Sequence, residues 1–228
     1  MLMSLKNKTA VVTGGAKGIG AATAKLFREA GAKVEILDIE SGCDVTDEAQ
    51  VRKAYERAGE IDILVNNAGT AVRRTALEVK KDEWDAVIEL NLTALFLCSR
   101  LAHPYMKKRG GGSIVNLASI MGLSGGIYPN ASYQASKGGV VNLTRALALE
   151  WAQDRIRVNA VAPTYVNTDL TVNIFNNPDV MEKVEAHTPL GVLPEVGDVA
   201  AAILFLASPA ARCITGVTLP VDSGYLAR

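Results

Sequence analysis

The chain has 228 residues, of which 49% are hydrophobic and 21% charged, and its 24 basic residues balance its 24 acidic ones. This composition is typical of a soluble globular protein, and the length fits one domain, residues 1–228, with a sizeable core. A formal net charge of zero gives no general attraction to nucleic acid or to an anionic membrane, so we expect neither as a partner.

Targeting and redox features favour the cytoplasm. The longest uncharged stretch, residues 110–136, is broken by glycine, proline and asparagine and does not predict a membrane helix. The first residues show no apolar core or cleavage pattern of a secretory signal. The cysteines Cys43, Cys98 and Cys213 are odd in number and far apart, which favours reduced thiols. With only two histidines, we expect no metal site.

The chain begins with a strand, a glycine-rich turn and a helix. Residues 9–12 form a short apolar run, residues 13–20 read Thr-Gly-Gly-Ala-Lys-Gly-Ile-Gly, and a helical pattern continues to about residue 30. Glycines allow the backbone to approach a pyrophosphate, and a helix N-terminus supplies free N–H groups. The turn is therefore a candidate phosphate-binding site.

A second strand, residues 33–37, ends in Asp38. A carboxylate at this place suits the ribose hydroxyls of NAD and repels the extra phosphate of NADP. Lys17 acts in the opposite direction, because a cation beside the turn could receive that phosphate, although it could equally be a solvated surface lysine. We expect NAD to be preferred, with NADP as the alternative.

The next segment is unusually short. Residues 39–43 are too few for a helical crossover between Asp38 and Asp44. We therefore expect the helix after the second strand to be missing and the third strand, at the sheet edge, to be short or absent. A helix to about residue 58 and a strand over residues 61–65 follow. That strand ends in Asn-Asn-Ala-Gly, residues 66–69, small and amide residues that suit a ligand lying across the strand end.

Two more helix and strand pairs precede the C-terminal region. Residues 82–109 form a long helical pattern, which the polar Asn91 could divide. The alternative interpretation of Asn91 is a kink or a buried amide bonded to backbone. The strand at 113–117 runs into Ser119. A helix over about 132–152 carries Tyr133 and Lys137, which share one helical face. A nearby cation favours the ionised phenol and so could make Tyr133 a base, although the spacing also arises by chance.

The last part of the chain combines regular elements with an irregular segment. We expect a strand at 155–162, a mobile substrate lid at 165–190, a helix at 198–206 and a final strand at 216–221.

Six motifs in this order closely resemble the short-chain dehydrogenase/reductase family over essentially the whole chain: Thr13-Gly14-x-x-x-Gly18-x-Gly20, Asn66-Asn67-Ala68-Gly69, Asn91, Ser119, Tyr133-x-x-x-Lys137 and Pro163-x-x-Val166-x-Thr168. The resemblance implies an α/β fold, a single-domain Rossmann-like doubly wound parallel sheet of six to seven strands with helices on both faces. It also implies a homotetramer formed through the helices at about 92–109 and 132–152.

The resemblance assigns roles to four catalytic residues. Tyr133 is implied as the general acid/base, Lys137 as the residue that lowers the phenol pKa and binds the nicotinamide ribose, Ser119 as the holder of the substrate oxygen, and Asn91 as the residue that positions a proton-conducting water. The hydride moves between substrate carbon and nicotinamide. Asp44 and Val45 are implied to flank the adenine, and Val166 and Thr168 to contact the carboxamide. The full expected cofactor set is Gly14, Lys17, Gly18, Ile19, Gly20, Asp38, Asp44, Val45, Asn67, Ala68, Gly69, Tyr133, Lys137, Pro163, Val166 and Thr168.

The sequence departs from the family at two positions and leaves the substrate open. Thr164 and Ser223 stand where the family usually has glycine. The expected pocket wall is mixed, formed by Ile120, Met121, Gly126, Ile127, Tyr128, Tyr165, Thr171, Phe175 and His187. Arg73 and Arg74 could receive a substrate carboxylate, although a surface pair is the favoured interpretation. The resemblance implies an NAD-dependent oxidoreductase acting on a polyol or sugar-type secondary alcohol. The alternatives are an NAD(P)H-dependent 3-oxoacyl or other carbonyl reductase and a nicotinamide-binding regulator without turnover.

Overall fold

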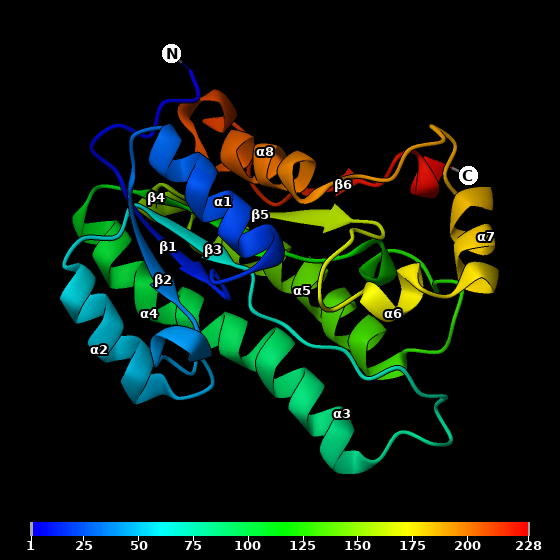
Figure 1. The fold of residues 1–228 in the computed structure, drawn as a ribbon. Coiled ribbons are helices and arrows are strands. Elements are labelled where there is room, and N and C mark those ends of the chain that lie inside the picture. Colours follow the sequence, from blue (N-terminus) through cyan, green and yellow to red (C-terminus); the bar gives the residue numbers. More distant parts are fainter. Residues whose placement is uncertain (1, 228) are drawn as a thin grey trace.

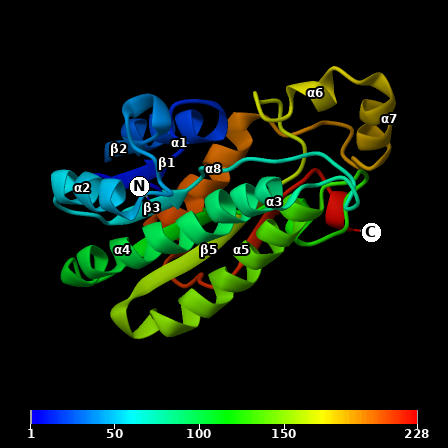
Figure 2. The same cartoon turned by 90° about the horizontal axis from the view of Figure 1, so that it is seen from below.

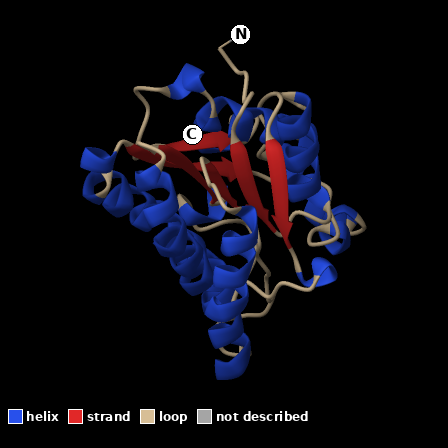
Figure 3. Ribbon diagram, turned by 90° about the vertical axis from the view of Figure 1, so that its left-hand side faces the viewer, coloured by secondary structure: helices blue, strands red, loops and turns tan. Residues whose placement is uncertain are grey.

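The computed structural model describes residues 2–227 and shows one parallel sheet between two layers of helices (Figure 1, Figure 3). The strands lie in the order β2-β1-β3-β4-β5-β6, and every neighbouring pair is parallel. The strands are β1 Thr9–Thr13, β2 Lys33–Leu37, β3 Ile63–Asn66, β4 Gly112–Leu117, β5 Ile156–Pro163 and β6 Thr218–Val221. The expected single-domain, doubly wound α/β fold is confirmed.

Helices cover both faces of the sheet, so the central strands are buried on both sides (Figure 1, Figure 3). Side chains alternate along β1: Ala10 and Val12 pack in the core beneath α1 and α8, whereas Val11 packs in the core shared with α2, α4 and α5. This double burial explains why the strands read as continuous apolar runs. The longer helices are α1 Gly18–Glu29, α2 Glu48–Ala58, α3 Lys81–Ile88, α4 Ala94–Lys108, α5 Ala131–Glu150, α7 Pro178–Ala186 and α8 Val196–Ala207.

The short segment after β2 contains no strand and no α-helix. A 3₁₀ turn, Ile39–Ser41, takes their place, and the Asp38 carboxylate caps it by accepting a hydrogen bond from the Glu40 N–H at 3.0 Å. Among the described residues β2 is therefore the edge strand, as the short segment predicts. This leaves the carboxyl end of β2 beside the glycine-rich turn.

The long helix after β3 is divided where Asn91 interrupts its apolar pattern. A five-residue π-helix, Glu89–Thr93, separates α3 from α4. The fully buried Asn91 amide bonds the backbone of Thr70 on both sides: its Oδ1 accepts from the Thr70 N–H at 2.8 Å and its Nδ2 donates to the Thr70 carbonyl at 2.9 Å. The division of the helix near Asn91 and the buried amide bonded to backbone are both observed. Short π-helical turns of this kind often occur at functional sites.

The continuous helical stretch Lys81–Lys108 is long and apolar enough, by length and composition alone, to cross a membrane, with 44% of its apolar window buried inside the structure. Its buried side chains, among them Cys98, Ala102 and Met106, belong to the core between α4, α2 and the sheet. A core helix of a soluble protein has the same character, so packing accounts for the apolar sequence.

Candidate active site

The carboxyl ends of β4 and β5 meet the start of α5 around one small cavity of about 50 Å³. Ser119 follows β4, Thr164 follows β5, and Tyr133 comes from the first turn of α5. In parallel sheets ligands bind outside the carboxyl ends of the strands, and here that edge brings the serine and tyrosine hydroxyls to one wall. Figures 1 and 2 place the helices α6, Val172–Phe175, and α7 beyond the same edge.

Lys137 lies beneath the Tyr133 ring, as the helical spacing predicts. Its ammonium nitrogen is 5.5 Å from the ring centre and donates a hydrogen bond to the Leu117 carbonyl at 2.6 Å. The side chain is only 4% exposed, and burial lowers the pKa of Lys137 to about 8. A buried cation without a carboxylate within 4.0 Å among the described residues is costly, which indicates a functional rather than a packing role.

The pKa of Tyr133 moves opposite to the expected direction. Burial raises it above its ordinary value, and the hydrogen bond from Ser119 opposes that rise without cancelling it. The net shift is set by burial, which favours the neutral phenol, and the ammonium of Lys137 is held by the Leu117 carbonyl, so the lowering expected from Lys137 stays a prediction. At neutral pH Tyr133 is an acid that can donate a proton.

Asn91 connects the catalytic helix to the segment after β3. Besides its bonds to Thr70, its Nδ2 donates to the Ser136 hydroxyl at 3.0 Å, one residue before Lys137. Both amide hydrogens are thus used within the protein. The side chain ties α5 to the segment after β3. The water that Asn91 is expected to position could therefore bind only the second lone pair of Oδ1 or main-chain atoms.

The glycine-rich turn packs directly against the Asn66–Gly69 segment. The Thr13 hydroxyl accepts hydrogen bonds from the N–H groups of Asn67 and Ala68 at 3.0 and 3.1 Å, and Asn67 Nδ2 donates to the Gly14 carbonyl at 2.7 Å. A Cβ on Gly20 would lie 2.1 Å from that same carbonyl, and one on Gly14 would lie 2.8 Å from Ala68 Cα. Side chains are excluded at both glycines, so this cradle is built by close backbone packing. Gly69, another expected cofactor residue, lies against the amide of Asn91: a Cβ added at Gly69 would lie 3.2 Å from Asn91 Oδ1.

The start of α1 is free to hold an anion. The helix begins at Gly18 without a side-chain cap and has no acidic residue in its first turn. A Cβ on Gly18 would lie 3.3 Å from Thr168 Cγ2, which places the segment after β5 over the turn. Uncapped N–H groups and the positive helix end favour phosphate, so the turn fits the diphosphate of NAD(P).

Asp38 and Lys17 occupy the adenosine side of this turn. The Asp38 carboxylate accepts from the Ala16 N–H at 3.0 Å, which joins the end of β2 to the turn. Lys17 Nζ is 2.6 Å from the Glu40 carboxylate and 3.8 Å from that of Asp169, and the hydrogen bond with Glu40 raises the pKa of Lys17. Lys17 is therefore neutralised by carboxylates.

The remaining expected cofactor residues pack in the core or form bonds within the protein. Ile19, Val45 and Val166 pack in the hydrophobic cores, and Val45 and Val166 are only 5% and 3% exposed. The Asp44 carboxylate accepts hydrogen bonds from the Thr46 N–H at 2.9 Å and from the Thr46 hydroxyl at 2.7 Å. Pro163 is the last residue of β5. The contacts expected of these residues with a cofactor remain predictions.

The cavity wall agrees in part with the expected pocket. Five expected residues line it: Ile120, Met121, Tyr128, Tyr165 and Thr171. Four others do not line it: Gly126, Ile127, Phe175 and His187. Ala71, Asn130 and Leu170 also line the cavity, although they carry no motif in the sequence. Arg73, for which a surface position was the favoured interpretation, lines it too. Only the fold reveals these four, because they come from three loops that are far apart in the sequence.

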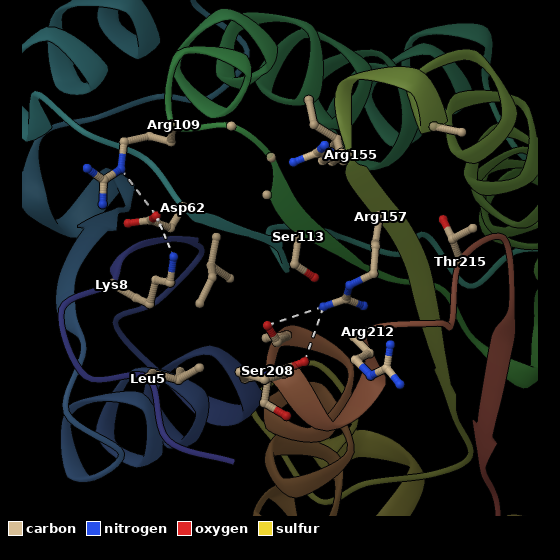
Figure 4. Close-up of a pocket in the computed structure, with 18 residues that line it drawn as sticks. Leu5, Lys8, Asp62, Arg109, Ser113, Arg155, Arg157, Ser208, Arg212 and Thr215 are labelled. Atoms are coloured by element: carbon tan, nitrogen blue, oxygen red, sulfur yellow. Dashed lines mark hydrogen bonds and ion pairs between the residues drawn. The ribbon is translucent and has the colours of Figure 1, made fainter. Parts of the chain in front are cut away.

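A larger cavity, of about 550 Å³, lies at the opposite edge of the sheet (Figure 4). Its wall includes residues that precede or begin β1, β3, β4 and β5. Figure 4 shows Lys8 and Arg109 converging on the Asp62 carboxylate, at 3.0 and 3.3 Å. None of the expected catalytic residues reaches it, and its ion pairs tie β1, β3 and the end of α4 together.

Comparison with known proteins agrees with this geometry. The family model described as "Enoyl-(Acyl carrier protein) reductase" matches residues 41–226. A cis-4-hydroxycyclohexanecarboxylate dehydrogenase of Sinomonas cyclohexanicum is 43% identical over 96% of this chain and 97% of its own length, and a galactitol 2-dehydrogenase (L-tagatose-forming) of Cereibacter sphaeroides is 40% identical over 97% and 96%.

A solved gluconate 5-dehydrogenase from Burkholderia cenocepacia J2315, in complex with NADP and tartrate, superposes with a TM-score of 0.92 at 30% identity, covering 100% of this chain and 98% of the other. The two relatives and the solved structure match over nearly the full length of both partners, whereas the family model begins after the glycine-rich cradle and covers the serine, the tyrosine and the lysine. The chain belongs to the short-chain dehydrogenase/reductase family.

Proposed function

We propose that this protein is an NAD(P)-dependent oxidoreductase that interconverts a secondary alcohol and its ketone. The observation that carries the proposal is the shared cavity of Ser119 and Tyr133, with Lys137 beneath the tyrosine ring. A protein that only bound nicotinamide would have no need to bury an unpaired lysine at this place. The intact arrangement therefore argues against a regulator without turnover.

Proton transfer is the task of the protein in this reaction. When bound, the nicotinamide ring exchanges a hydride with the substrate carbon that carries the oxygen. In the reducing direction Tyr133, which burial keeps protonated, donates its proton to the carbonyl oxygen and is left as a phenolate; in the oxidising direction that phenolate takes the proton of the alcohol. Ser119 hydrogen-bonds the same oxygen, and the positive charge of Lys137 stabilises negative charge that develops on the phenol.

The surroundings of Asp38 support a preference for NAD. Asp38 and Glu40 place two carboxylates at the end of β2, and Lys17, the only cation proposed for a 2′-phosphate, is paired with Glu40 and close to Asp169. A 2′-phosphate would meet like charge. The oxygens of Asp38 each accept one hydrogen bond from the protein and keep capacity for ribose hydroxyls.

The substrate is proposed to be a polyol or sugar-type alcohol. The cavity wall offers hydroxyl, amide and guanidinium groups beside apolar ones, and the relatives named above act on galactitol, gluconate and a hydroxycyclohexanecarboxylate. A carbonyl reductase of acyl substrates is the second candidate, favoured by the description of the matching family model.

Three further properties belong to the proposal. Residues 165–190 act as a substrate lid, because Ile174 and Val184 from α6 and α7 pack on the cavity residues Tyr165, Ile120 and Met121. The protein is a homotetramer assembled through α4 and α5, which leave Phe96 and Leu149 exposed, and it acts in the cytoplasm, in keeping with free cysteines.

Initial rates of the purified protein with NAD and with NADP test the proposal. The substrate panel comprises sugar alcohols, neutral secondary alcohols, hydroxy acids and the matching carbonyls. We expect oxidation with NAD on a polyol or hydroxy acid. Cofactor binding without turnover on any member would overturn the proposed enzyme and favour the regulator.

A further inference from the structure

Buried polar atoms without partners gather around the small cavity. Among the described residues seven buried side-chain nitrogen or oxygen atoms lack a hydrogen-bond partner, and four of these belong to residues lining this cavity. The four atoms are Arg73 Nε, Asn130 Oδ1, Thr164 Oγ1 and Tyr165 Oη. Because proteins leave few such groups unpaired, their concentration around one cavity indicates a polar ligand that binds there.

The charge of the cavity is uncompensated. No aspartate or glutamate is present among the described residues that line it. Arg73 donates from Nη2 to the Leu170 carbonyl at 2.7 Å and has no carboxylate within 4.0 Å in the described part of the chain. The adjacent Arg74, by contrast, is paired with Glu83 at 3.0 Å, outside the cavity. The two arginines are therefore different: Arg74 is a surface ion pair, and Arg73 is a partly buried cation with a free Nε.

The hydroxyl groups beside Arg73 remain donors. Burial raises the pKa of Tyr165 far above its ordinary value, and burial also raises that of Tyr128 despite the opposing effect of its hydrogen bond with Arg73. Neither phenol ionises near neutral pH, so both can donate to a negative ligand. Thr164, where the family usually has glycine, adds a further unpaired hydroxyl.

We propose that Arg73 binds the carboxylate of the substrate, with the Tyr165 and Thr164 hydroxyls as additional donors, so that the substrate is a hydroxy acid and the product an oxo acid. This inference rests on the proposed function, since the reacting hydroxyl lies at Ser119 and Tyr133 in the same cavity. A guanidinium matches the planar pair of carboxylate oxygens. One arginine suits a singly charged carboxylate better than a doubly charged phosphate ester.

The test compares each hydroxy acid that is turned over with its own primary amide, which keeps the shape and loses the charge. For the Arg73→Gln variant we expect kcat/KM to fall about 10- to 100-fold on the acid, mainly through KM, and to change less than about three-fold on the amide. Arg73→Lys should show a smaller loss than Arg73→Gln, because lysine keeps the positive charge but lacks the paired N–H donors of the planar guanidinium. Arg74→Gln is the matched control and should leave both substrates within about two-fold.

The outcomes separate this inference from the proposed function. Absence of turnover on every alcohol would overturn the proposed function itself. Turnover in which Arg73→Gln affects acid and amide equally would show that Arg73 only anchors the lid through Leu170, and would overturn the inference alone. Competitive inhibition by cyclohexanecarboxylate and by cyclohexyl phosphate distinguishes the two anions: we expect the carboxylate to inhibit more strongly, and the reverse order would refute carboxylate recognition.

Discussion

Replacing Lys137 with methionine should change how the stability of the protein depends on pH. Lys137 is 4% exposed, and burial lowers its pKa from the ordinary 10.5 to about 8. The unfolded chain therefore binds this proton more tightly than the folded protein does between these two values. The cost of the buried ammonium is fully present below about pH 8 and is relieved as the pH rises toward 10.5.

The size of the effect follows from the shift. At 1.36 kcal/mol per pKa unit, the buried charge costs about 3 kcal/mol at neutral pH. Near pH 9.5 the folded protein has already released this proton, because the pH lies above the folded pKa of about 8. The remaining cost is that of deprotonating a lysine whose unfolded pKa is 10.5, and it falls to about 1–2 kcal/mol. Methionine removes this cost and also the hydrogen bond to the Leu117 carbonyl, a loss of about 1–3 kcal/mol that offsets part of the gain. The net gain can therefore be small, whereas its change with pH should be about 2 kcal/mol.

Thermal unfolding of wild type and Lys137→Met, followed by far-UV circular dichroism at equal protomer concentration, measures this change. The difference in Tm between variant and wild type should fall by about 4–8 °C between about pH 7 and about pH 9.5. Lys53→Met, at an exposed position on α2, is the control and should show no such trend. A Lys137→Met difference that stays constant over this range would refute the burial argument.

Two other substitutions test the cofactor site and the opposite edge of the sheet. Removing the carboxylate in Asp38→Ala should raise the ratio of kcat/KM with NADP to that with NAD by about ten-fold or more, because a like charge near the 2′-phosphate is lost; an unchanged ratio would contradict our account of cofactor preference. Asp62→Asn should destabilise the protein by about 2–4 kcal/mol near neutral pH, since the carboxylate is 4% exposed and bonds Thr9 N–H, Lys8 and Arg109. Although burial opposes the charge, these bonds hold the pKa of Asp62 below its ordinary value, so urea unfolding should show the difference shrinking as the pH falls through about 4 and below. A difference that does not shrink in acid would contradict this explanation.

Local pattern was sufficient to predict the sheet and its missing strand. Mostly apolar runs ending in glycine or polar residues predicted all six strands. The four central strands are largely buried, whereas the edge strands β2 and β6 are only partly buried. The short stretch after Asp38 predicted the absent crossover from chain length alone. The interruption at Asn91 predicted the break in the long helix, although not that it is π-helical, which depends on hydrogen bonds to Thr70 and Ser136.

The electrostatics of the site could not be predicted from spacing. The i, i+4 relation of Tyr133 and Lys137 gave their proximity, but the direction of the tyrosine pKa shift depends on how the loops and the helices α6 and α7 pack around the ring. In the same way, adjacent arginines looked equivalent in sequence. Only the path of the loop after β3 sends Arg73 to Leu170 and the cavity while Arg74 turns to Glu83.

The most direct test of the central claim is the turnover of Tyr133→Phe beside its cofactor affinity. The initial rate of NAD reduction on the best alcohol and the dissociation constant of NADH, measured by fluorescence titration, are compared between wild type and variant. We expect removal of the phenol hydroxyl to lower kcat by about 10²- to 10⁴-fold while the dissociation constant changes less than about three-fold. A variant that keeps wild-type turnover would contradict the assignment of Tyr133 as the proton donor and acceptor.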